Sequence, residues 1–311
     1  MSDIKNVMVV GLGAIGSIYA AKLKAYDPNC VRVLIDQQRL ERYQTNGIVL
    51  NGVRYDFHYA LPETNGKKAD LILIATKADG LTEAINAIAG FIHDETIVLA
   101  LLNGVTSEDL IAARYGWNRV LHSFFVGHGS TRSGNAIMFD GVGRIVFGEA
   151  NASGRRARVD KVCRFFDQAG IAYEVPDDIL FSQWCKFVLN VGINQASAIL
   201  RASYGDFQRS AKAYNIALGL MQEAIAVAEK VGIHQIDGLL PWCENFIRNT
   251  PPAFKSSMLQ DIEAGKKTEV DIFGGAVCAL GEKYDVPTRQ NALFVTLIKA
   301  LEEVEASRST I

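Results

Sequence analysis

The sequence predicts an α/β protein with a Rossmann-type, doubly wound amino-terminal domain followed by an all-α carboxy-terminal domain. A buried strand leads directly into a G-x-G-x-x-G turn near the amino terminus, and apolar strands then alternate with helical segments through the first hundred residues. After Pro176 almost every segment has helical periodicity. We therefore expect a dinucleotide-binding domain over residues 1–176 and a helical substrate-binding domain over residues 177–311.

The first predicted strand, Val7–Val10, is apolar at every position, which is typical of a strand buried on both faces. In the turn that follows, Gly11 permits a tight bend, Gly13 lets the backbone approach a pyrophosphate, and Gly16 lets the next helix pack closely. A helix that begins near Ala14 directs N–H groups at the phosphates. The predicted cofactor-binding residues of this turn are Gly11, Leu12, Gly13, Ala14, Ile15 and Gly16.

The second strand, residues 31–35, ends at Asp36, twenty positions after Gly16. An acidic side chain there accepts hydrogen bonds from the ribose hydroxyls of a dinucleotide. A βαβ turn that binds no ligand is the structural alternative. The other elements expected in this domain are a hairpin of residues 48–50 and 53–57, strands over 70–75, 96–101, 120–126, 135–139, 143–147 and 171–175, and helices over 37–46, 81–91 and 156–169.

The composition excludes several classes of protein. With 311 residues, 49% of them hydrophobic, and a formal net charge of −2, the chain gives no electrostatic reason to expect nucleic acid or an anionic membrane as a partner. No apolar run approaches the length of a membrane span, and no signal peptide precedes the first strand, so we expect a cytoplasmic location. The five cysteines are scattered and lack C-x-x-C spacing, which argues against a metal centre and a disulfide framework.

The second half contains an apolar helix with polar residues along one face. Within the helix expected over residues 179–200, Lys186, Asn190 and Asn194 follow one another at intervals of four. Burying a lysine and two amides is costly unless they have partners, and a substrate can be that partner. The alternative for Lys186 is a lysine that snorkels from the end of an apolar helix. The other helices expected here cover residues 210–231, 237–249, 253–264, 269–284 and 289–304.

A further informative stretch is SSMLQDIEAGKKTEVD, which begins at residue 256. Ser257 and Asp261 share one face of the helix predicted there. Thr268 and Asp271 resemble a capping box that opens the next helix, with Glu269 in its first turn. Since a carboxylate in a first turn is favourable with the helix dipole, Glu269 has a structural explanation beside the functional one.

Five segments together carry a resemblance to a known family: GLGAIG, LILIATKA, LLNGV, WCKFVLNVGIN and SSMLQDIEAGKKTEVD. In this order and at these separations they resemble the ketopantoate reductases (2-dehydropantoate 2-reductases), a family that includes NAD-dependent D-2-hydroxyacid dehydrogenases of the D-mandelate type. The resemblance covers nearly the whole chain. It implies an oxidoreductase that transfers hydride between a nicotinamide cofactor and C2 of a 2-oxo acid, giving a D-(R)-2-hydroxy acid.

The resemblance also implies roles for individual residues. Lys186 matches the catalytic general acid that protonates the substrate carbonyl, and Glu269 matches the acidic residue that touches the cofactor and tunes that lysine. His128 falls where many members have a histidine beside the nicotinamide. A histidine that only packs in the core is an equal alternative for it. The remaining matches are Lys77 and Asn103 near the cofactor, Asn190 and Asn194 beside the lysine and the substrate, and Ser257 and Asp261 around the substrate carboxylate.

Two departures from the family pattern bear on specificity. Asp36 stands where NADPH-using members commonly have an arginine, and because a carboxylate repels a 2′-phosphate we expect NADH to be preferred over NADPH. Arg39, three residues later, argues against this preference, because its side chain can still reach a 2′-phosphate. Phe254 stands where members acting on ketopantoate usually have an asparagine, which favours a substrate with an apolar or aromatic side chain.

Three functions stay open at this point. The first is a reductase that makes pantoate in pantothenate biosynthesis, and the second is an NAD-dependent D-2-hydroxyacid dehydrogenase acting on aromatic or branched 2-oxo acids. The third is a non-catalytic, dinucleotide-sensing regulator, although a sensor has no need of a proton donor such as Lys186. A monomer and a homodimer are equally compatible with the sequence, and the helix expected over 210–231 is a candidate dimer interface.

Overall fold

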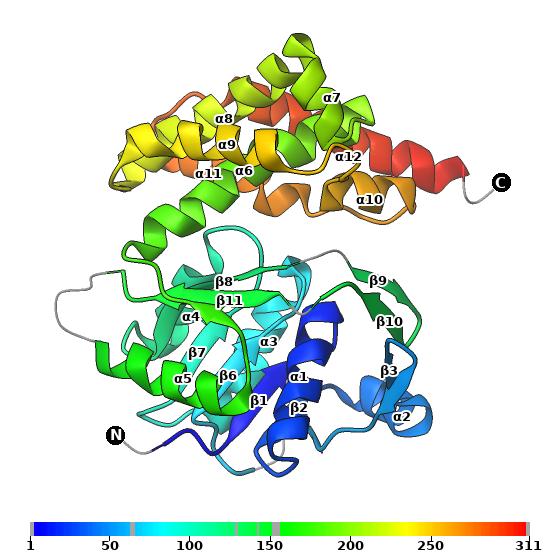
Figure 1. Ribbon diagram of the computed structural model, residues 1–311, viewed down its shortest axis with the longest axis vertical. Helices are drawn as coiled ribbons and strands as arrows, with labels where there is room; N and C mark the ends of the chain where they lie inside the picture. Colours follow the sequence, from blue (N-terminus) through cyan, green and yellow to red (C-terminus); the bar gives the residue numbers. More distant parts are fainter. Residues whose placement is uncertain (1–2, 63–65, 128–129, 142, 151–155, 309–311) are drawn as a thin grey trace. The chain divides into compact units, whose positions relative to one another are not determined.

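The computed structural model describes residues 3–62, 66–127, 130–141, 143–150 and 156–308 (Figure 1). The chain divides into two compact units. Unit 1 comprises Met1–Asn103 and Ser107–Ile179, and unit 2 comprises Gly104–Thr106 and Leu180–Ile311. The sequence-based boundary after residue 176 stays a prediction about the folding domains. His128 lies outside the described residues.

Unit 1 is built on a sheet that has eight strands in the described part of the chain (Figure 1). The strands β5, β2, β1, β6, β7 and β8 are parallel and follow the order of a doubly wound nucleotide-binding fold, with the order reversing between β1 and β6. Across the sheet they are β12 (Tyr173–Glu174), β11 (Arg144–Gly148), β8 (Val120–Val126), β7 (Ile97–Ala100), β6 (Leu71–Ile74), β1 (Val7–Val10), β2 (Val31–Leu34) and β5 (Tyr59–Ala60).

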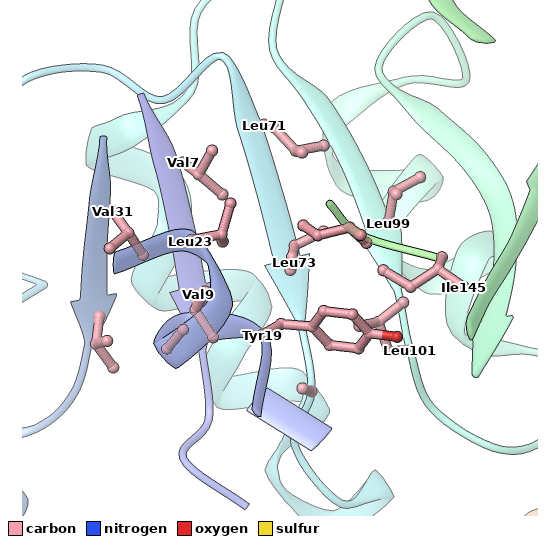
Figure 2. Packing of buried hydrophobic residues seen from close by; sticks show 14 of the residues in the cluster. Val7, Val9, Tyr19, Leu23, Val31, Leu71, Leu73, Leu99, Leu101 and Ile145 are labelled. Atoms are coloured by element: carbon pink, nitrogen blue, oxygen red, sulfur yellow. The ribbon is translucent and has the colours of Figure 1, made fainter. Parts of the chain in front are cut away.

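Both faces of this sheet are covered by helices, which explains why its central strands are apolar throughout. Val9 and Leu73 lie on one face, where Tyr19 packs over them (Figure 2), whereas Met8 and Ile72 lie on the other. Helices α1 (Ala14–Tyr26) and α5 (Arg156–Ala169) cover the first face, and α3 (Leu81–Ala87) and α4 (Ser107–Tyr115) cover the second. Because both faces are covered, residues of this sheet can reach a ligand at the ends of its strands.

A second, smaller sheet holds the predicted hairpin and a further hairpin from later in the chain. Across it lie β4 (Val53–Tyr55), β3 (Ile48–Leu50), β10 (Ala136–Phe139) and β9 (Ser130–Ser133). Strand β10 joins β3 in a parallel pair. The sequence analysis did not predict α4, β5 or β9, and the helix expected over 81–91 ends in a 3₁₀ turn, η2 (Ile88–Phe91). Unit 1 also contains α2 (Gln37–Asn46) and the 3₁₀ turn η1 (Ala78–Gly80).

Unit 2 is helical, as the periodicity of the sequence predicts. Its central helix α6 buries residues on most of its circumference, among them Phe187 and Val191. Helix α8 also buries one apolar face, including Leu220 and Met221, so the candidate dimer interface is a core helix of the unit. The helices are α6 (Ile179–Leu200), α7 (Tyr204–Arg209), α8 (Ala211–Val231), α9 (Leu239–Asn249), α10 (Ser257–Glu263), α11 (Gly274–Tyr284) and α12 (Arg289–Arg308), with 3₁₀ turns η3 (Ile236–Gly238) and η4 (Val270–Ile272).

Two local predictions in unit 2 are wrong. The helix expected from residue 253 begins at Ser257, because the side chain of Ser256 caps it by accepting a hydrogen bond from the N–H of Leu259 (3.1 Å). The capping box expected between Thr268 and Asp271 does not form, since Asp271 instead pairs with Lys299 (2.6 Å). Glu269 is consequently the N-cap residue of η4 and does not lie in a first helical turn.

Candidate functional site

Two glycines of the turn between β1 and α1 are required by the fold itself. Gly11 has a φ of +93°, and a Cβ placed on it would lie 2.9 Å from the carbonyl oxygen of Ala75. A Cβ placed on Gly16 would lie only 1.9 Å from the carbonyl oxygen of Gly11. A larger residue at either position would therefore separate α1 from the sheet.

Gly13 is different, because a Cβ there would meet nothing closer than the carbonyl oxygen of Ala75 at 3.7 Å. A ligand that approaches the backbone explains this glycine, as a pyrophosphate at the start of α1 would. Beside the turn, the buried Oγ1 of Thr76 has no hydrogen-bond partner among the described residues. A glycine with room for a ligand and an unsatisfied hydroxyl, at the point where the strand order reverses, fit the pyrophosphate of a dinucleotide.

Asp36 lies at the carboxyl end of β2, where it is the N-cap residue of α2. Its Oδ1 accepts a hydrogen bond from the N–H of Arg39 (2.7 Å), and its Oδ2 lies 3.4 Å from Nη1 of Arg39. About half of each side chain is exposed, 51% for Asp36 and 54% for Arg39. A carboxylate can accept about four hydrogen bonds, so Asp36 retains acceptor capacity for ribose hydroxyls while it caps the helix.

Lys77 and Asn103 follow the neighbouring parallel strands β6 and β7. Lys77 is exposed and is the N-cap residue of η1, and Asn103 is partly buried. Because carboxyl ends of parallel strands meet at one edge of a sheet, unit 1 brings these two residues to the same edge as Gly11 and Asp36.

In unit 2, α6 presents Lys186, Asn190 and Asn194 on successive turns of one side, as the sequence predicts. Asn194 is 3% exposed, and the other two side chains are partly buried. Burial lowers the pKa of Lys186 to about 8, and the negative charge of Glu269 opposes that shift. Lys186 lies in the interior of a 22-residue helix, so the alternative of a lysine that snorkels from a helix end does not apply to it.

The start of α10 is tied to α6 by two buried hydroxyl groups. The Oγ atoms of Ser197 and Ser256 lie 2.5 Å apart, and Ser197 also donates to the carbonyl oxygen of Asn194 (3.0 Å). These bonds fix the helix that carries Ser257 and Asp261, the first exposed and the second partly buried. The sequence motif contains both Ser256 and Ser257, but only Ser257 was predicted to have a role. The contact of Ser197 with Ser256 was not predicted.

Phe254, two residues before this cap, packs edge-to-face against Tyr204 with ring centroids 5.7 Å apart. Its carbonyl oxygen also accepts a hydrogen bond from the N–H of Tyr204 (3.0 Å). The Phe254 side chain is nevertheless 42% exposed. One part of the ring is therefore fixed and another part is open to an apolar contact.

The predicted cofactor residues other than Glu269 lie in unit 1, and Glu269 lies in unit 2 with all the predicted substrate residues. Within the described ranges, no group of three or more His, Cys, Asp or Glu side chains is placed to hold a metal ion. None of the helices in those ranges combines the length and apolarity needed to span a membrane.

Comparison with known proteins gives the family. The family model described as "Ketopantoate reductase PanE/ApbA" matches residues 7–152. The model described as "Ketopantoate reductase PanE/ApbA C terminal" matches residues 178–302. A 2-dehydropantoate 2-reductase from Archaeoglobus fulgidus is 27% identical over 303 residues, which cover 96% of this chain and 98% of the relative.

Two solved structures share the fold. D-mandelate dehydrogenase in a ternary structure with NADH and anilino(oxo)acetate superposes with a TM-score of 0.84 at 23% identity, covering 97% of this chain and 99% of that one. A dimeric ketopantoate reductase from Staphylococcus aureus superposes with a TM-score of 0.75 at 18% identity, covering 96% and 99%. Both halves of the chain match the same family, in the order that the sequence motifs indicate. The chain belongs to the ketopantoate reductase family of oxidoreductases.

Proposed function

We propose that the protein is a nicotinamide-dependent reductase that converts a 2-oxo acid to a D-(R)-2-hydroxy acid. Lys186 carries the proposal, because burial lowers its pKa to about 8 while the charge of Glu269 supports the protonated form. A lysine whose pKa lies near the working pH can give up a proton and recover it. A non-catalytic regulator that only senses a dinucleotide needs no such group.

The nicotinamide cofactor, when bound, supplies the hydride that adds to C2 of the 2-oxo acid. Lys186 donates its proton to the carbonyl oxygen, so that the oxygen leaves the reaction as a hydroxyl. Before that transfer, the ammonium charge of Lys186 polarises the carbonyl and stabilises the negative charge that develops on oxygen. Glu269 keeps Lys186 in its charged form, which the reducing direction requires.

The substrate is held by polar groups that the helices already fix. We assign the amide groups of Asn190 and Asn194 to the 2-oxo acid and to the orientation of Lys186. The hydroxyl of Ser257 and the neighbouring side chain of Asp261 are assigned to the surroundings of the substrate carboxylate. Lys77, Asn103 and the turn of Gly11, Leu12, Gly13, Ala14, Ile15 and Gly16 are assigned to the cofactor.

The cofactor proposed is NADH in preference to NADPH. Asp36 supports this preference, since its carboxylate lies at the end of β2 and keeps acceptor capacity for ribose hydroxyls. The ternary D-mandelate dehydrogenase structure of similar fold contains NADH. Arg39 already pairs with Asp36, which leaves it poorly placed to neutralise a 2′-phosphate.

Two substrate classes are candidates, ketopantoate and a 2-oxo acid with an aromatic or branched side chain. The exposed part of the Phe254 ring favours the second class, because an aromatic surface offers apolar contact and no hydrogen bond to a substrate hydroxyl. The curated relatives that are 2-dehydropantoate 2-reductases favour the first.

Steady-state kinetics with NADH and NADPH, each against ketopantoate, phenylglyoxylate and 2-oxoisocaproate, decides between them. A kcat/KM with NADH that is highest for phenylglyoxylate or 2-oxoisocaproate supports a D-2-hydroxyacid dehydrogenase. A kcat/KM that is highest for ketopantoate supports the reductase of pantothenate biosynthesis. Tight binding of NADH without turnover of any 2-oxo acid contradicts the proposed function and favours a dinucleotide sensor.

A homodimer is the oligomeric state we propose to test. Exposed apolar side chains follow one side of α12, namely Leu293, Leu297 and Val304, which are 56%, 41% and 46% exposed. They are spaced by about one and two helical turns, so they form an apolar face on which α12 of a second copy can pack. Light scattering of the wild type and of the Leu297→Glu variant distinguishes a dimer held by α12 from a monomer.

A further inference from the structure

An arginine that the sequence analysis did not single out binds the glycine-rich turn. Arg132 lies on β9, and its Nη1 donates a hydrogen bond of 2.7 Å to the carbonyl oxygen of Leu12. Its Nη2 lies 3.2 Å from the hydroxyl oxygen of Tyr43 on α2, and its Nε donates to the carbonyl oxygen of Gly134 (2.9 Å). One partly buried guanidinium thus connects the turn, the helix that Asp36 caps, and the second sheet.

The bond to Leu12 controls the direction of an N–H group. The carbonyl of Leu12 and the N–H of Gly13 belong to one planar trans peptide, so they point in opposite directions. By holding the carbonyl, Arg132 directs the Gly13 N–H away from itself. That N–H lies at the glycine where the fold leaves open space for a Cβ.

The same place carries a second positive charge. A second guanidinium, that of Arg42, donates to the hydroxyl oxygen of Tyr43 (2.8 Å) and lies over the Tyr43 ring, 4.7 Å from its centroid. Among the described residues, no carboxylate pairs with Arg42 or Arg132. A phosphate is the chemistry that complements two such charges beside open backbone N–H groups.

We propose that Arg132 is a positioning residue of the dinucleotide site, which aims the Gly13 N–H at the cofactor pyrophosphate and adds its positive charge there. The inference rests on the nicotinamide cofactor of the proposed function. Lysine cannot replace arginine fully, since a single ammonium lacks the planar fork that reaches Leu12, Tyr43 and Gly134 together.

The test measures binding without catalysis. Dissociation constants of NADH are measured by fluorescence titration for the wild type, Arg132→Gln and Arg132→Lys, and those of ADP-ribose and adenosine by displacement of NADH. We expect Arg132→Gln to weaken NADH and ADP-ribose about 10- to 100-fold, as for the loss of a hydrogen bond to a charged group. Arg132→Lys recovers part of that loss, and adenosine, which has no phosphate, binds within about twofold of wild type.

A matched control is Arg144→Gln on β11, which removes one arginine from the eight-stranded sheet, where it pairs with Glu174, away from the turn. Its affinity for ADP-ribose should equal that of the wild type. ADP-ribose affinity within twofold of wild type in Arg132→Gln overturns the inference, as does an equal loss for adenosine and ADP-ribose, which would indicate damage to α2. Failure of the wild type itself to bind NADH contradicts the proposed function instead. Thermal unfolding of each variant, with Arg132→Lys as the milder change, separates lost binding from lost folding.

Discussion

The hydroxyl oxygens of Ser197 and Ser256 lie 2.5 Å apart in the interior of unit 2. Ser197 gives its proton to the carbonyl oxygen of Asn194, so the proton between the two hydroxyls comes from Ser256. Ser256 in turn accepts a hydrogen bond from the N–H of Leu259. Each hydroxyl donates once and accepts once. The first turn of α10 is thereby joined to α6 at Ser197, which bonds the backbone carbonyl of Asn194, a residue assigned to the substrate.

Replacing Ser256 by alanine should therefore affect both stability and substrate binding. The variant loses an N-cap and leaves Ser197 without its donor, which should reduce the free energy of unfolding by about 1–2 kcal/mol. Because α10 then shifts relative to Asn194, we expect KM for the 2-oxo acid to rise while the dissociation constant of NADH stays constant. Chemical unfolding and steady-state kinetics measure the two effects.

Ser210→Ala is the matched control for that experiment. Ser210 caps α8 by accepting a hydrogen bond from the N–H of Ala213 (3.2 Å), and this cap is exposed. The control should lose similar stability with an unchanged KM. Equal KM values for Ser256→Ala and the wild type would show that the hydroxyl pair serves stability alone.

The pKa of Lys186, about 8, predicts opposite pH profiles for the two directions of the reaction. Reduction needs the protonated lysine, so kcat/KM in that direction should be level below pH 8 and fall above it. Oxidation needs the neutral lysine, so its kcat/KM should rise up to about pH 8 and then level. Lys186→Ala should lower kcat by about 10²- to 10⁴-fold. A loss below tenfold would contradict the assignment of Lys186 as general acid.

Glu269→Gln should shift the reducing profile to lower pH. The Glu269 carboxylate raises the pKa of Lys186 against the effect of burial, and the amide removes that charge. The pH at which kcat/KM begins to fall in the reducing direction should decrease, while the oxidising profile reaches its plateau earlier. An unchanged profile would mean that Glu269 acts on the cofactor or the fold and not on Lys186.

Asp36→Ser should change the choice of cofactor. Serine is as good an N-cap as aspartate, so α2 keeps its start while the negative charge disappears and Arg39 loses its partner. We expect the ratio of kcat/KM for NADPH to that for NADH to rise about tenfold or more. Adding Arg39→Ala to the variant should remove the gain in NADPH use, because the arginine is the group that would bind the 2′-phosphate.

Phe254→Asn should move substrate preference towards ketopantoate. An amide can form a hydrogen bond with the hydroxyl of ketopantoate, but it loses the apolar contact with an aromatic substrate. The ratio of kcat/KM for ketopantoate to kcat/KM for phenylglyoxylate should therefore rise about 10- to 100-fold. Phe246→Asn is the control, since Phe246 is similarly exposed on α9 and stacks with Trp242. The same change of ratio in both variants would argue against a specific role for Phe254.

Elements whose signals are local could be predicted from the sequence. The bounds of α2 are confirmed because Asp36 caps its start and Gly47, with a φ of +61°, ends it. The helix expected over residues 179–200 is confirmed, and its spacing alone places Lys186, Asn190 and Asn194 on one side. The catalytic and binding roles of those residues stay predictions.

Features that depend on distant partners could not be predicted. Strand β9 has the sequence Ser-Thr-Arg-Ser, which has no apolar alternation, and it forms because it pairs with β10. Arg132 lies 120 positions from Leu12, and Ser197 lies 59 positions from Ser256. No periodicity or motif reports a hydrogen bond between residues that far apart.

The short segment Gly104–Thr106 limits how far the two halves of this chain are modular. It belongs to unit 2, where Val105 packs against the helical core, although the chain on either side of it belongs to unit 1. A fragment that begins at Leu180 would consequently lack a partly buried side chain that packs against its helical core. Recombination that exchanged helical halves between relatives would have to preserve the fit of this residue, so the loop after β7 and the helical core must evolve together.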